Sequence, residues 1–449
     1  MMIMVMKLNT IKNIHKTKIL FVRKIKSWNN YPKIRHKNIQ SFKDDISFSD
    51  NNLAHGFGRS YGDVCLNENG NLILTNDLNS IIEFDTENGI LKCDAGISLK
   101  EVLNLIAPSG WFLPVVPGTQ YVSVGGAIAN DIHGKNHHKF GSFGNFITSF
   151  ELLRSNGEII NCNESENEDY FKATIGGIGL TGIIISAEIK LIKIESEYID
   201  AKTLRYESLQ EYWEINQEAE ENFDYTVSWV DCSVQSKRGL RGVFHSGNHS
   251  ENYIEKKDKK DLSINVPFTP PISLVNNLSM KIINEVYYGI NKKENLKSQH
   301  YKSFFFPLDF IGSWGKAYGT KGFFQYQFVI PIENGINGVD KILNEIKNHG
   351  QIPALGVLKT FGDIKSIGMM SFPRKGITMA LDFQNKGNKT LEFLDRLDKI
   401  VMEYGGALYP AKDSRMSKNI FQSSFPNLHE FANFIDPKFS SSFWRRVNN

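Results

Sequence analysis

Three glycine-rich segments are the first residues of this chain whose types and spacing indicate chemistry. They are residues 56–63 (GFGRSYGD), residues 117–130 (PGTQYVSVGGAIAN) and residues 176–182 (GGIGLTG). Glycine permits positive φ and lets backbone N–H groups approach an anion closely. The Gly125-Gly126 pair also opens a helical turn, and a helix N-terminus suits an anion. Together the three turns could wrap one extended pyrophosphate, although each alone equally suits a tight turn without a ligand.

The order of the glycines excludes two common nucleotide-binding motifs. The chain has no GxGxxG string between a strand and a helix, and no GxxxxGKS or GxxxxGKT string. A dinucleotide-binding Rossmann unit and a P-loop are therefore both excluded.

Polar side chains form a second group of candidates. The histidine string over residues 133–138 lacks the carboxylate or cysteine partners usual for zinc and offers Lys135 instead, so we expect no metal site. Gln325 and Gln327 point to one face of a strand because side chains alternate with period two. Two amides that face a cavity suit hydroxyl recognition. Lys412 lies in a charged loop segment and is a further candidate. From the residues alone, the histidines could be polar loop residues, the two glutamines could lie on a surface strand, and Lys412 could be solvated.

The elements that must position these residues begin with short strands. Residues 72–95 contain apolar runs that alternate with Asn, Asp and Gly turns, and residues 99–107 show helical spacing. Between residues 150 and 194, two apolar runs flank Asn156-Gly157, which is a good hairpin signal. A long apolar strand ends this segment, and the fold class predicted for it is α+β.

The pattern changes after residue 195, where a second domain is expected. Its predicted strands contain Tyr and Trp (DYTVSWVDCS, FFQYQFVIPI, GITMALDFQN), and helices are predicted over residues 338–348 and 390–404. This combination favours a sheet with helices on one side. Between residues 247 and 295, a charged run (EKKDKKD) and a proline cluster (PFTPP) predict an exposed, partly mobile loop.

Length and composition limit the class of protein. A chain of 449 residues exceeds the usual size of one hydrophobic core, so two or more domains are expected. The contents of 41% hydrophobic and 22% charged residues are typical of soluble globular proteins, and no run of 18 apolar residues occurs, which excludes an integral membrane protein. The four cysteines lie far apart, which predicts reduced thiols rather than a zinc or redox site.

The N-terminal segment is basic, although the net charge of the chain is only +3. Eleven Lys and Arg residues precede the first acidic residue, Asp44. This segment either contacts anionic phospholipid or is a solvated extension, and the residues leave both open. The apolar residues 1–6 are too short for a signal-peptide core, so the expected location is cytoplasmic, with peripheral contact at the inner membrane. We expect no nucleic-acid partner.

The chain resembles the decaprenylphosphoryl-ribose 2-oxidase family of FAD-linked oxidoreductases, within the vanillyl-alcohol-oxidase superfamily. The motifs that carry the resemblance are, in order, GFGRSYGD, PGTQYVSVGGAIANDIHGKNHHKFGSFGN, ATIGGIGLTGI, FFQYQFVIP and LYPAKDSR. The likeness extends from about residue 27 to near the C-terminus, and DIHGKNHH is its most specific part. The first 26 residues and residues 247–295 match poorly.

The resemblance implies a two-domain vanillyl-alcohol-oxidase fold. Residues 27–195 and the returning segment 405–449 bind FAD, residues 196–404 form a substrate cap with a sheet and covering helices, and residues 1–26 are a basic extension. Arg59 stands where relatives with covalent flavin carry histidine, so FAD is expected to be held non-covalently. The implied FAD contacts are Gly58, Arg59, Ser60, Tyr61, Gly62, Gly118, Ser123, Val124, Gly125, Gly126, Asn130, Asp131, Ile132, His133, Ile184 and Tyr409.

The resemblance also implies catalytic roles for His133 and Lys412. His133 lies beside the flavin and the sugar in that family. Lys412 reaches both, where a cation stabilises negative charge that develops on the ring. One of the two accepts the hydroxyl proton, and the sequence does not rank them. The implied substrate contacts are Tyr61, Lys135, Trp229, Gln325, Gln327 and Lys359.

The implied activity is oxidation of a secondary hydroxyl, C2 of a polyprenyl-phosphate pentose or a related glycosyl lipid, by hydride transfer to flavin N5. It would be the first half of a 2-epimerisation, with a partner keto-reductase and a quinone or another external electron acceptor. Ala380 stands where mycobacterial members carry cysteine, and Thr378 stands at a family asparagine, so the sugar and lipid remain open. The alternatives are a soluble aldonolactone oxidase of the same superfamily, against which the missing flavin-linking histidine counts, and a non-catalytic FAD-binding subunit.

Overall fold

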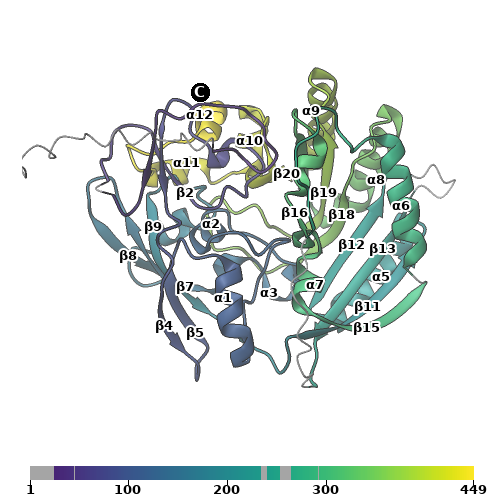
Figure 1. Ribbon diagram of the computed structural model, residues 1–449, viewed down its shortest axis with the longest axis horizontal. Helices are drawn as coiled ribbons and strands as arrows, with labels where there is room; N and C mark the ends of the chain where they lie inside the picture. Colours follow the sequence, from purple (N-terminus) through teal and green to yellow (C-terminus); the bar gives the residue numbers. More distant parts are fainter. Residues whose placement is uncertain (1–24, 45, 234–239, 253–263, 292, 449) are drawn as a thin grey trace, which may run out of the picture.

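The computed structural model describes residues 25–44, 46–233, 240–252, 264–291 and 293–448. In Figure 1 these residues form two lobes side by side, with the C-terminal helices on the lobe that contains the N-terminal half of the chain. Most of the basic N-terminal segment (residues 1–24) and the charged run over residues 255–261 lie outside the described residues.

The first lobe contains two main sheets. A parallel three-stranded sheet has the order β1-β3-β2, and an antiparallel five-stranded sheet has the order β4-β5-β9-β7-β8. Their strands are β1 (Asn38–Ser41), β2 (Asn52–His55), β3 (Asn71–Leu74), β4 (Ile81–Asp85), β5 (Ile90–Asp94), β7 (Ile147–Leu153), β8 (Ile159–Asn163) and β9 (Ile183–Lys190). A short pair, β6 (Trp111–Phe112) and β10 (Ile192–Lys193), adjoins them. The predicted hairpin is present, since β7 pairs with β8 around Gly157 at φ +87°.

Four short helices pack on this lobe: α1 (Leu99–Ile106), α2 (Val124–Ala129), α3 (His137–Phe140) and α4 (Glu168–Thr174). The helix α1 begins with a capping box, in which Ser98 and Glu101 bond each other's backbone N–H groups. Its Leu99, Val102, Leu103 and Ile106 are buried, so one apolar stripe fixes the helix on the sheet.

The second lobe is built on one antiparallel sheet of eight strands in the order β15-β11-β13-β12-β18-β19-β17-β20. The strands are β11 (Tyr198–Tyr206), β12 (Tyr225–Asp231), β13 (Arg241–His249), β15 (Glu294–His300), β17 (Phe323–Ile330), β18 (Gly356–Phe361), β19 (Gly376–Gln384) and β20 (Ala407–Leu408). A separate short pair consists of β14 (Ile264–Asn265) and β16 (Ile311–Gly312).

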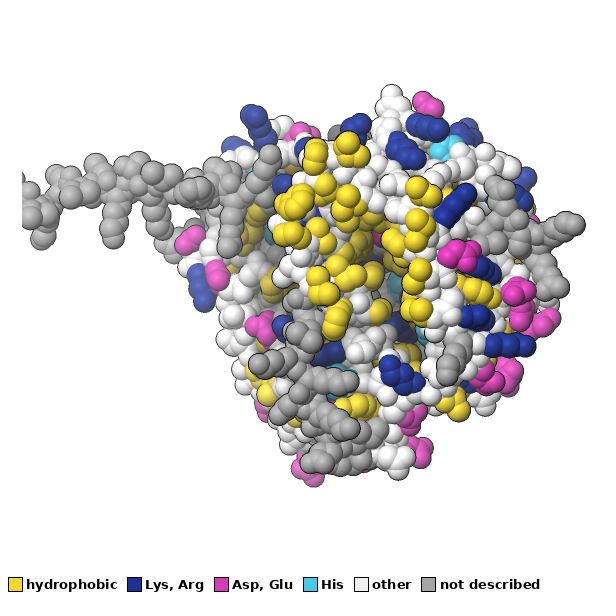
Figure 2. All heavy atoms as spheres, turned by 45° about the vertical axis from the view of Figure 1, so that its right-hand side comes forward, with side chains coloured by type: hydrophobic (Ala, Val, Ile, Leu, Met, Phe, Trp, Pro, Cys, Tyr) yellow, Lys and Arg dark blue, Asp and Glu magenta, His cyan; other side chains and the backbone are white. Residues whose placement is uncertain are grey.

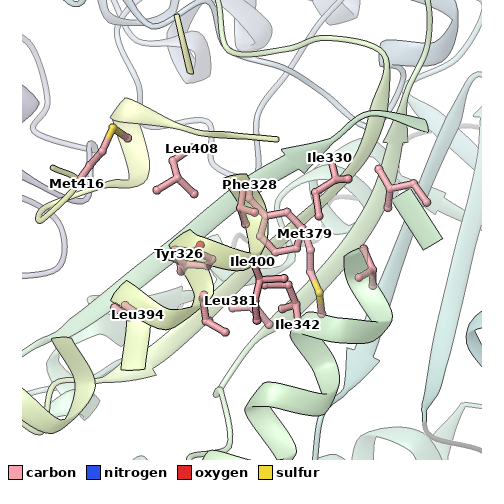
Figure 3. Close-up of a cluster of buried hydrophobic side chains, with 14 of the residues drawn as sticks. Tyr326, Phe328, Ile330, Ile342, Met379, Leu381, Leu394, Ile400, Leu408 and Met416 are labelled. Carbon is pink, nitrogen blue, oxygen red and sulfur yellow. The ribbon is translucent and has the colours of Figure 1, made fainter. Parts of the chain in front are cut away.

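Three long helices pack on one face of this sheet: α5 (Leu209–Asn222), α8 (Ile332–His349) and α9 (Asn388–Glu403). Tyr326 and Phe328 of β17 pack with Ile342 of α8 and Ile400 of α9 in the core (Figure 3). Since side chains alternate along a strand, the residues between them on β17 must point to the opposite face. The sheet is therefore apolar toward these three helices and free to carry polar groups on its other face.

The C-terminal segment returns to the first lobe with α10 (Lys418–Ser424), α11 (Leu428–Phe431) and α12 (Ser442–Asn448). Asn52 N donates to the Lys438 carbonyl at 2.8 Å. Arg446 forms two hydrogen bonds with the Asp63 carboxylate at 2.7 and 2.9 Å. Arg446 also donates to Asp413 at 3.1 Å, which fixes the position of the segment just before α10, where Lys412 lies.

The mixture of helices and strands agrees with the α+β class, but one local expectation was wrong. Within the predicted loop over residues 247–295, the structure has the 14-residue helix α6 (Asn277–Ile290) and then β15; the short helix α7 (Tyr301–Phe305) follows. Asn276 caps α6 by accepting from two backbone N–H groups, a signal that the nearby charged run and prolines obscured. No helix among the described residues is both long and apolar enough to cross a membrane.

Candidate functional site

A cavity of about 690 Å³ is lined by residues of both lobes. From the first lobe it receives the glycine-rich turns, and from the second it receives the polar face of the eight-stranded sheet. Its volume lies within the range of cofactor and ligand pockets.

The register of four neighbouring strands aligns one row of cavity residues. Trp229 of β12 pairs with Val357 of β18, Val357 pairs with Ala380 of β19, and Ala380 pairs with Gln327 of β17. All four line the cavity. The row runs from the indole ring of Trp229 to the side-chain amide of Gln327, with Val357 and Ala380 between them. Gln327 therefore points away from the core, as the period-two pattern predicted.

His133 is held at both ring nitrogens. Its Nε2 lies 2.9 Å from Gln327 Nε2, and its Nδ1 lies 2.9 Å from Lys359 Nζ, which also donates to the Gly134 carbonyl at 2.7 Å. Burial first, then the charge of Lys359, lowers the pKa of His133 well below its usual value. The ring is therefore neutral and fixed in place, and its protein partners already occupy both nitrogens.

Three half-buried lysines line the same cavity. Burial lowers the pKa of Lys135 and of Lys359 to about 7, and that of Lys412 to about 8. Lys135 Nζ donates to the carbonyls of Phe304 and Phe305 at the end of α7. A bound anion would favour the charged forms of all three, which makes the cluster suited to an acidic substrate.

Lys412 differs from the other two in having a free ammonium group. Its Nζ lies 4.1 Å from the centre of the Tyr61 ring, and no described residue accepts a hydrogen bond from it. The pKa of Lys412 is raised toward its usual value by the Asp382 carboxylate, although burial has the larger effect. Lys412 therefore exchanges its proton near physiological pH, and its Nζ is available to a ligand.

Asp382 is a site residue that the sequence analysis missed. It is fully buried on β19, where Gln325 donates to its Oδ1 at 2.7 Å and its Oδ2 has no hydrogen-bond partner. Burial raises its pKa to about 7. The only signal in the sequence was its spacing of two residues from Ala380, which puts both side chains on the cavity face of the strand.

The residues of the glycine-rich turns fit a long ligand with a polar, anionic middle. Gly58 has φ +61°, and a Cβ on Gly118 would meet no atom within 4 Å, so it would project into open space. Arg59 Nε and Asn130 Oδ1 are buried without hydrogen-bond partners along the cavity. Such orphaned groups are costly unless a ligand or water satisfies them. The arrangement fits FAD.

Arg59 is held by aromatic rings. Its guanidinium carbon lies 4.4 Å from the centre of the Trp28 ring and 5.2 Å from that of the Tyr121 ring. The stacking fixes the side chain over the cavity, where a guanidinium can bind an anion but cannot form the bond that a histidine forms with flavin.

Most of the residues singled out in the sequence lie together here. Those that line the cavity are Gly58, Arg59, Ser60, Tyr61, Gly118, Ser123, Gly125, Gly126, Asn130, Ile132, His133, Lys135, Ile184, Trp229, Gln325, Gln327, Lys359, Tyr409 and Lys412.

Gly62, Val124 and Asp131 do not line it. A Cβ on Gly62 would lie 1.7 Å from the Asp413 carbonyl oxygen, so glycine there allows the turn to pack against the segment with Lys412. Val124 is a core residue. Asp131 accepts from Gly144 N at 2.8 Å and from the Ser142 hydroxyl at 2.8 Å, which positions the His133 loop from behind.

Comparison with known proteins gives a consistent result. Residues 50–163 match the model of an FAD binding domain. The chain is 37% identical over 410 residues, 88% of each chain, to decaprenylphosphoryl-beta-D-ribose oxidase of Mycolicibacterium smegmatis. Shorter similarities cover 30% of the chain: 33% identity to the delta(24)-sterol reductase of Macaca fascicularis and 28% identity to a putative D-arabinono-1,4-lactone oxidase of Neurospora crassa, over 25% and 24% of those proteins.

Proposed function

Because this chain belongs to the family of FAD-dependent oxidoreductases that includes decaprenylphosphoryl-beta-D-ribose oxidase, we propose that it oxidises the C2 hydroxyl of a polyprenyl-phosphate pentose or a related glycosyl lipid. The observation that supports this best is that three half-buried lysines and two glutamines line one cavity together with the glycine-rich turns. Lysines suit a phosphate and amides suit sugar hydroxyls. No catalytic metal is required by this proposal.

The proposed division of the chain follows the cavity. Residues 27–195 and 405–449 hold FAD non-covalently, and residues 196–404 cover the substrate. The FAD contacts are the cavity-lining residues of the turns, together with Ile184 and Tyr409, whose hydroxyl donates to the Asn130 carbonyl at 2.9 Å. FAD, when bound, supplies the acceptor for the hydride from the substrate carbon.

Lys412 rather than His133 is the group proposed to take the hydroxyl proton. Both ring nitrogens of His133 are engaged by Gln327 and Lys359, whereas Lys412 Nζ is free. With a pKa of about 8, Lys412 is partly neutral at physiological pH and can accept a proton at Nζ. The ammonium formed then lies where negative charge develops, so the same side chain also stabilises the transition state.

The binding roles divide among the remaining residues. Gln325 and Gln327 bind sugar hydroxyls, Lys359 and Lys135 bind the phosphate, and Trp229 and Tyr61 form apolar walls. The Trp229 ring is itself braced by Tyr287 at 4.7 Å between ring centres.

Anaerobic mixing of the purified flavoprotein with candidate lipid-phosphate pentoses tests the proposal. Bleaching of the flavin by such a pentose, and not by free aldonolactones, supports it. Bleaching only by an aldonolactone would favour the lactone oxidase, and no bleaching by any sugar would favour a non-catalytic subunit. The keto product would require a partner reductase to complete 2-epimerisation, and the flavin would require a quinone or another external acceptor.

Acid precipitation is expected to release all the yellow colour into the supernatant. Arg59 occupies the position of the flavin-linking histidine and stacks on Trp28, so no covalent bond forms there. The absorbance of the supernatant and of the redissolved pellet near 450 nm measures the outcome. Flavin that stays with the washed pellet would contradict non-covalent binding.

Ala380→Cys is expected to place a reactive thiol on the cavity wall, because Ala380 lines the cavity between Val357 and Gln327. A small thiol-directed probe should label the variant, and substrate should slow the labelling. Met379→Cys is the matched control, since Met379 points into the core on the other face of β19. Labelling at 379 but not at 380 would show that the strand faces the opposite way.

A further inference from the structure

Exposed hydrophobic side chains are concentrated in one part of the second lobe. Of the 16 large hydrophobic residues that are exposed among the described residues, 12 lie between residues 264 and 311. Except for Leu296, which pairs with Lys202 on the sheet face that carries α5, they gather on one face of the molecule, as Figure 2 shows. They are Ile264, Phe268, Ile272, Leu274, Leu278, Ile282, Ile283, Val286, Ile290, Leu296, Phe310 and Ile311. Soluble monomers rarely expose apolar side chains in such numbers in one place, so the face is expected to meet a partner.

The helix α6 presents its apolar side outward. Leu278, Ile282, Val286 and Ile290 recur every four residues, and 57–71% of each is exposed. The polar Asn284, in contrast, is buried and donates to Asp231 Oδ1 at 2.7 Å. A helix on a water-exposed surface has the reverse arrangement. The outward stripe is therefore matched to an apolar environment.

The charges around this face are basic. Lys281, Lys293 and Lys297 are exposed on or next to α6 and β15. The nearby acids are neutralised from within the protein: Glu285 pairs with Arg241 at 2.7 Å, and Glu294 pairs with Lys202 at 3.2 Å. An apolar stripe with basic neighbours is the pattern of a helix that lies in the interface of an anionic bilayer.

The apolar face borders the cavity. Ile283 is 54% exposed and also lines the cavity, together with Tyr287 of the same helix and Leu308. A ligand with an apolar tail can thus have its polar group among the cavity lysines and its tail along α6. This continuity distinguishes the face from an isolated patch.

The geometry points to a docking surface for an anionic lipid bilayer, formed by α6 and the apolar residues between 264 and 311. This inference rests on the proposed function, since an amphiphilic substrate would enter from the bilayer at Ile283. A second copy of the chain fits less well, because a two-fold interface would bury the exposed lysines of α6 and β15 against a face whose Glu285 already pairs with Arg241.

Vesicle co-sedimentation of the full-length flavoprotein tests the surface. The variant Leu278→Glu/Ile282→Glu/Val286→Glu changes three outward residues that do not line the cavity. The matched control, Ile82→Glu/Leu105→Glu/Ile159→Glu, adds the same charge at three exposed apolar positions of the first lobe. Flavin content and thermal unfolding establish that each variant is folded.

The wild type and the control are expected to bind vesicles of phosphatidylcholine with phosphatidylglycerol, and the α6 variant at least tenfold less. Part of the wild-type binding should persist in 1 M salt, where the Debye length is about 3 Å, because apolar insertion is not screened. Equal binding by the α6 variant would overturn the proposal. The proposal would also be overturned if the wild type were a dimer that does not bind vesicles and the α6 variant were a monomer.

A water-soluble pentose phosphate with a short lipid tail, used as substrate, distinguishes this inference from the proposed function. If the α6 variant loses vesicle binding but reduces its flavin with this substrate as fast as the wild type, the surface acts in docking alone. Vesicle binding is measured without substrate. If no pentose reduced the flavin, the proposed function would be refuted, and the result on vesicle docking would still stand.

Discussion

Lys412→Ala is expected to lower the rate of flavin reduction by substrate at least 100-fold while the protein folds and keeps its FAD. Lys412 Nζ lies over Tyr61 and forms no hydrogen bond with the described residues, so its loss removes little structural support. Removing a group that acts chiefly in the transition state costs about 10²–10³ in rate. Stopped-flow reduction at saturating substrate, with flavin content measured on the same sample, gives the result.

Lys418→Ala is the matched control for this change. Lys418 is an exposed lysine on the same C-terminal segment, where its Nζ donates to the Asn448 carbonyl at 3.2 Å. Its replacement should leave the rate within twofold of the wild type. A Lys412→Ala enzyme that reduces at a near wild-type rate, with full flavin content, would remove Lys412 from the catalytic role.

The sequence was sufficient where local patterns determine the outcome. The period-two pattern placed Gln325 and Gln327 on the face of β17 opposite Tyr326 and Phe328, because a strand in a packed sheet has only two faces. The glycine turns were also visible, since left-handed φ and close backbone approach leave few alternatives to glycine. Motif order then supplied the family, which the comparisons confirm.

What the sequence could not provide are the contacts between distant segments. Gln327 meets His133 across 194 residues, and Asp382 meets Gln325 across 57 residues. The Gln325–Asp382 pair depends on the register of β17 against β19, and the Gln327–His133 pair depends on how the His133 loop packs on β17; local patterns specify neither. Gly62 and Asp131 lie behind the cavity and show the same limit of local patterns. Both belong to motifs that predicted FAD contacts, yet each packs one loop on another.

The helix α6 was missed for a different reason. Its apolar residues have helical spacing, but the expected buried stripe is turned outward, and the preceding charges and prolines favour a loop. A sequence pattern records amphipathicity, whereas the side that faces water depends on what the helix packs against.

Asp382→Asn is expected to shift the pH dependence of flavin reduction to lower pH. If Lys412 Nζ accepts the hydroxyl proton, it must be neutral first, so the wild-type rate rises as pH increases through the Lys412 pKa of about 8. The Asp382 carboxylate raises that pKa against the larger effect of burial. Asparagine removes the negative charge but keeps an oxygen that can accept from Gln325. The pKa of Lys412 therefore falls further, and the increase in reduction rate begins at a pH lower by on the order of one unit.

Reduction rates of the wild type, Asp382→Asn and Lys412→Ala between pH 6 and 10 measure this shift. Lys412→Ala should lose the rise altogether, which assigns it to the lysine and not to the substrate. A wild-type rate that instead falls through pH 8 would mean that Lys412 acts in its protonated, charged form. The hydroxyl proton would then have to go to His133, whose two nitrogens would first have to release Gln327 or Lys359.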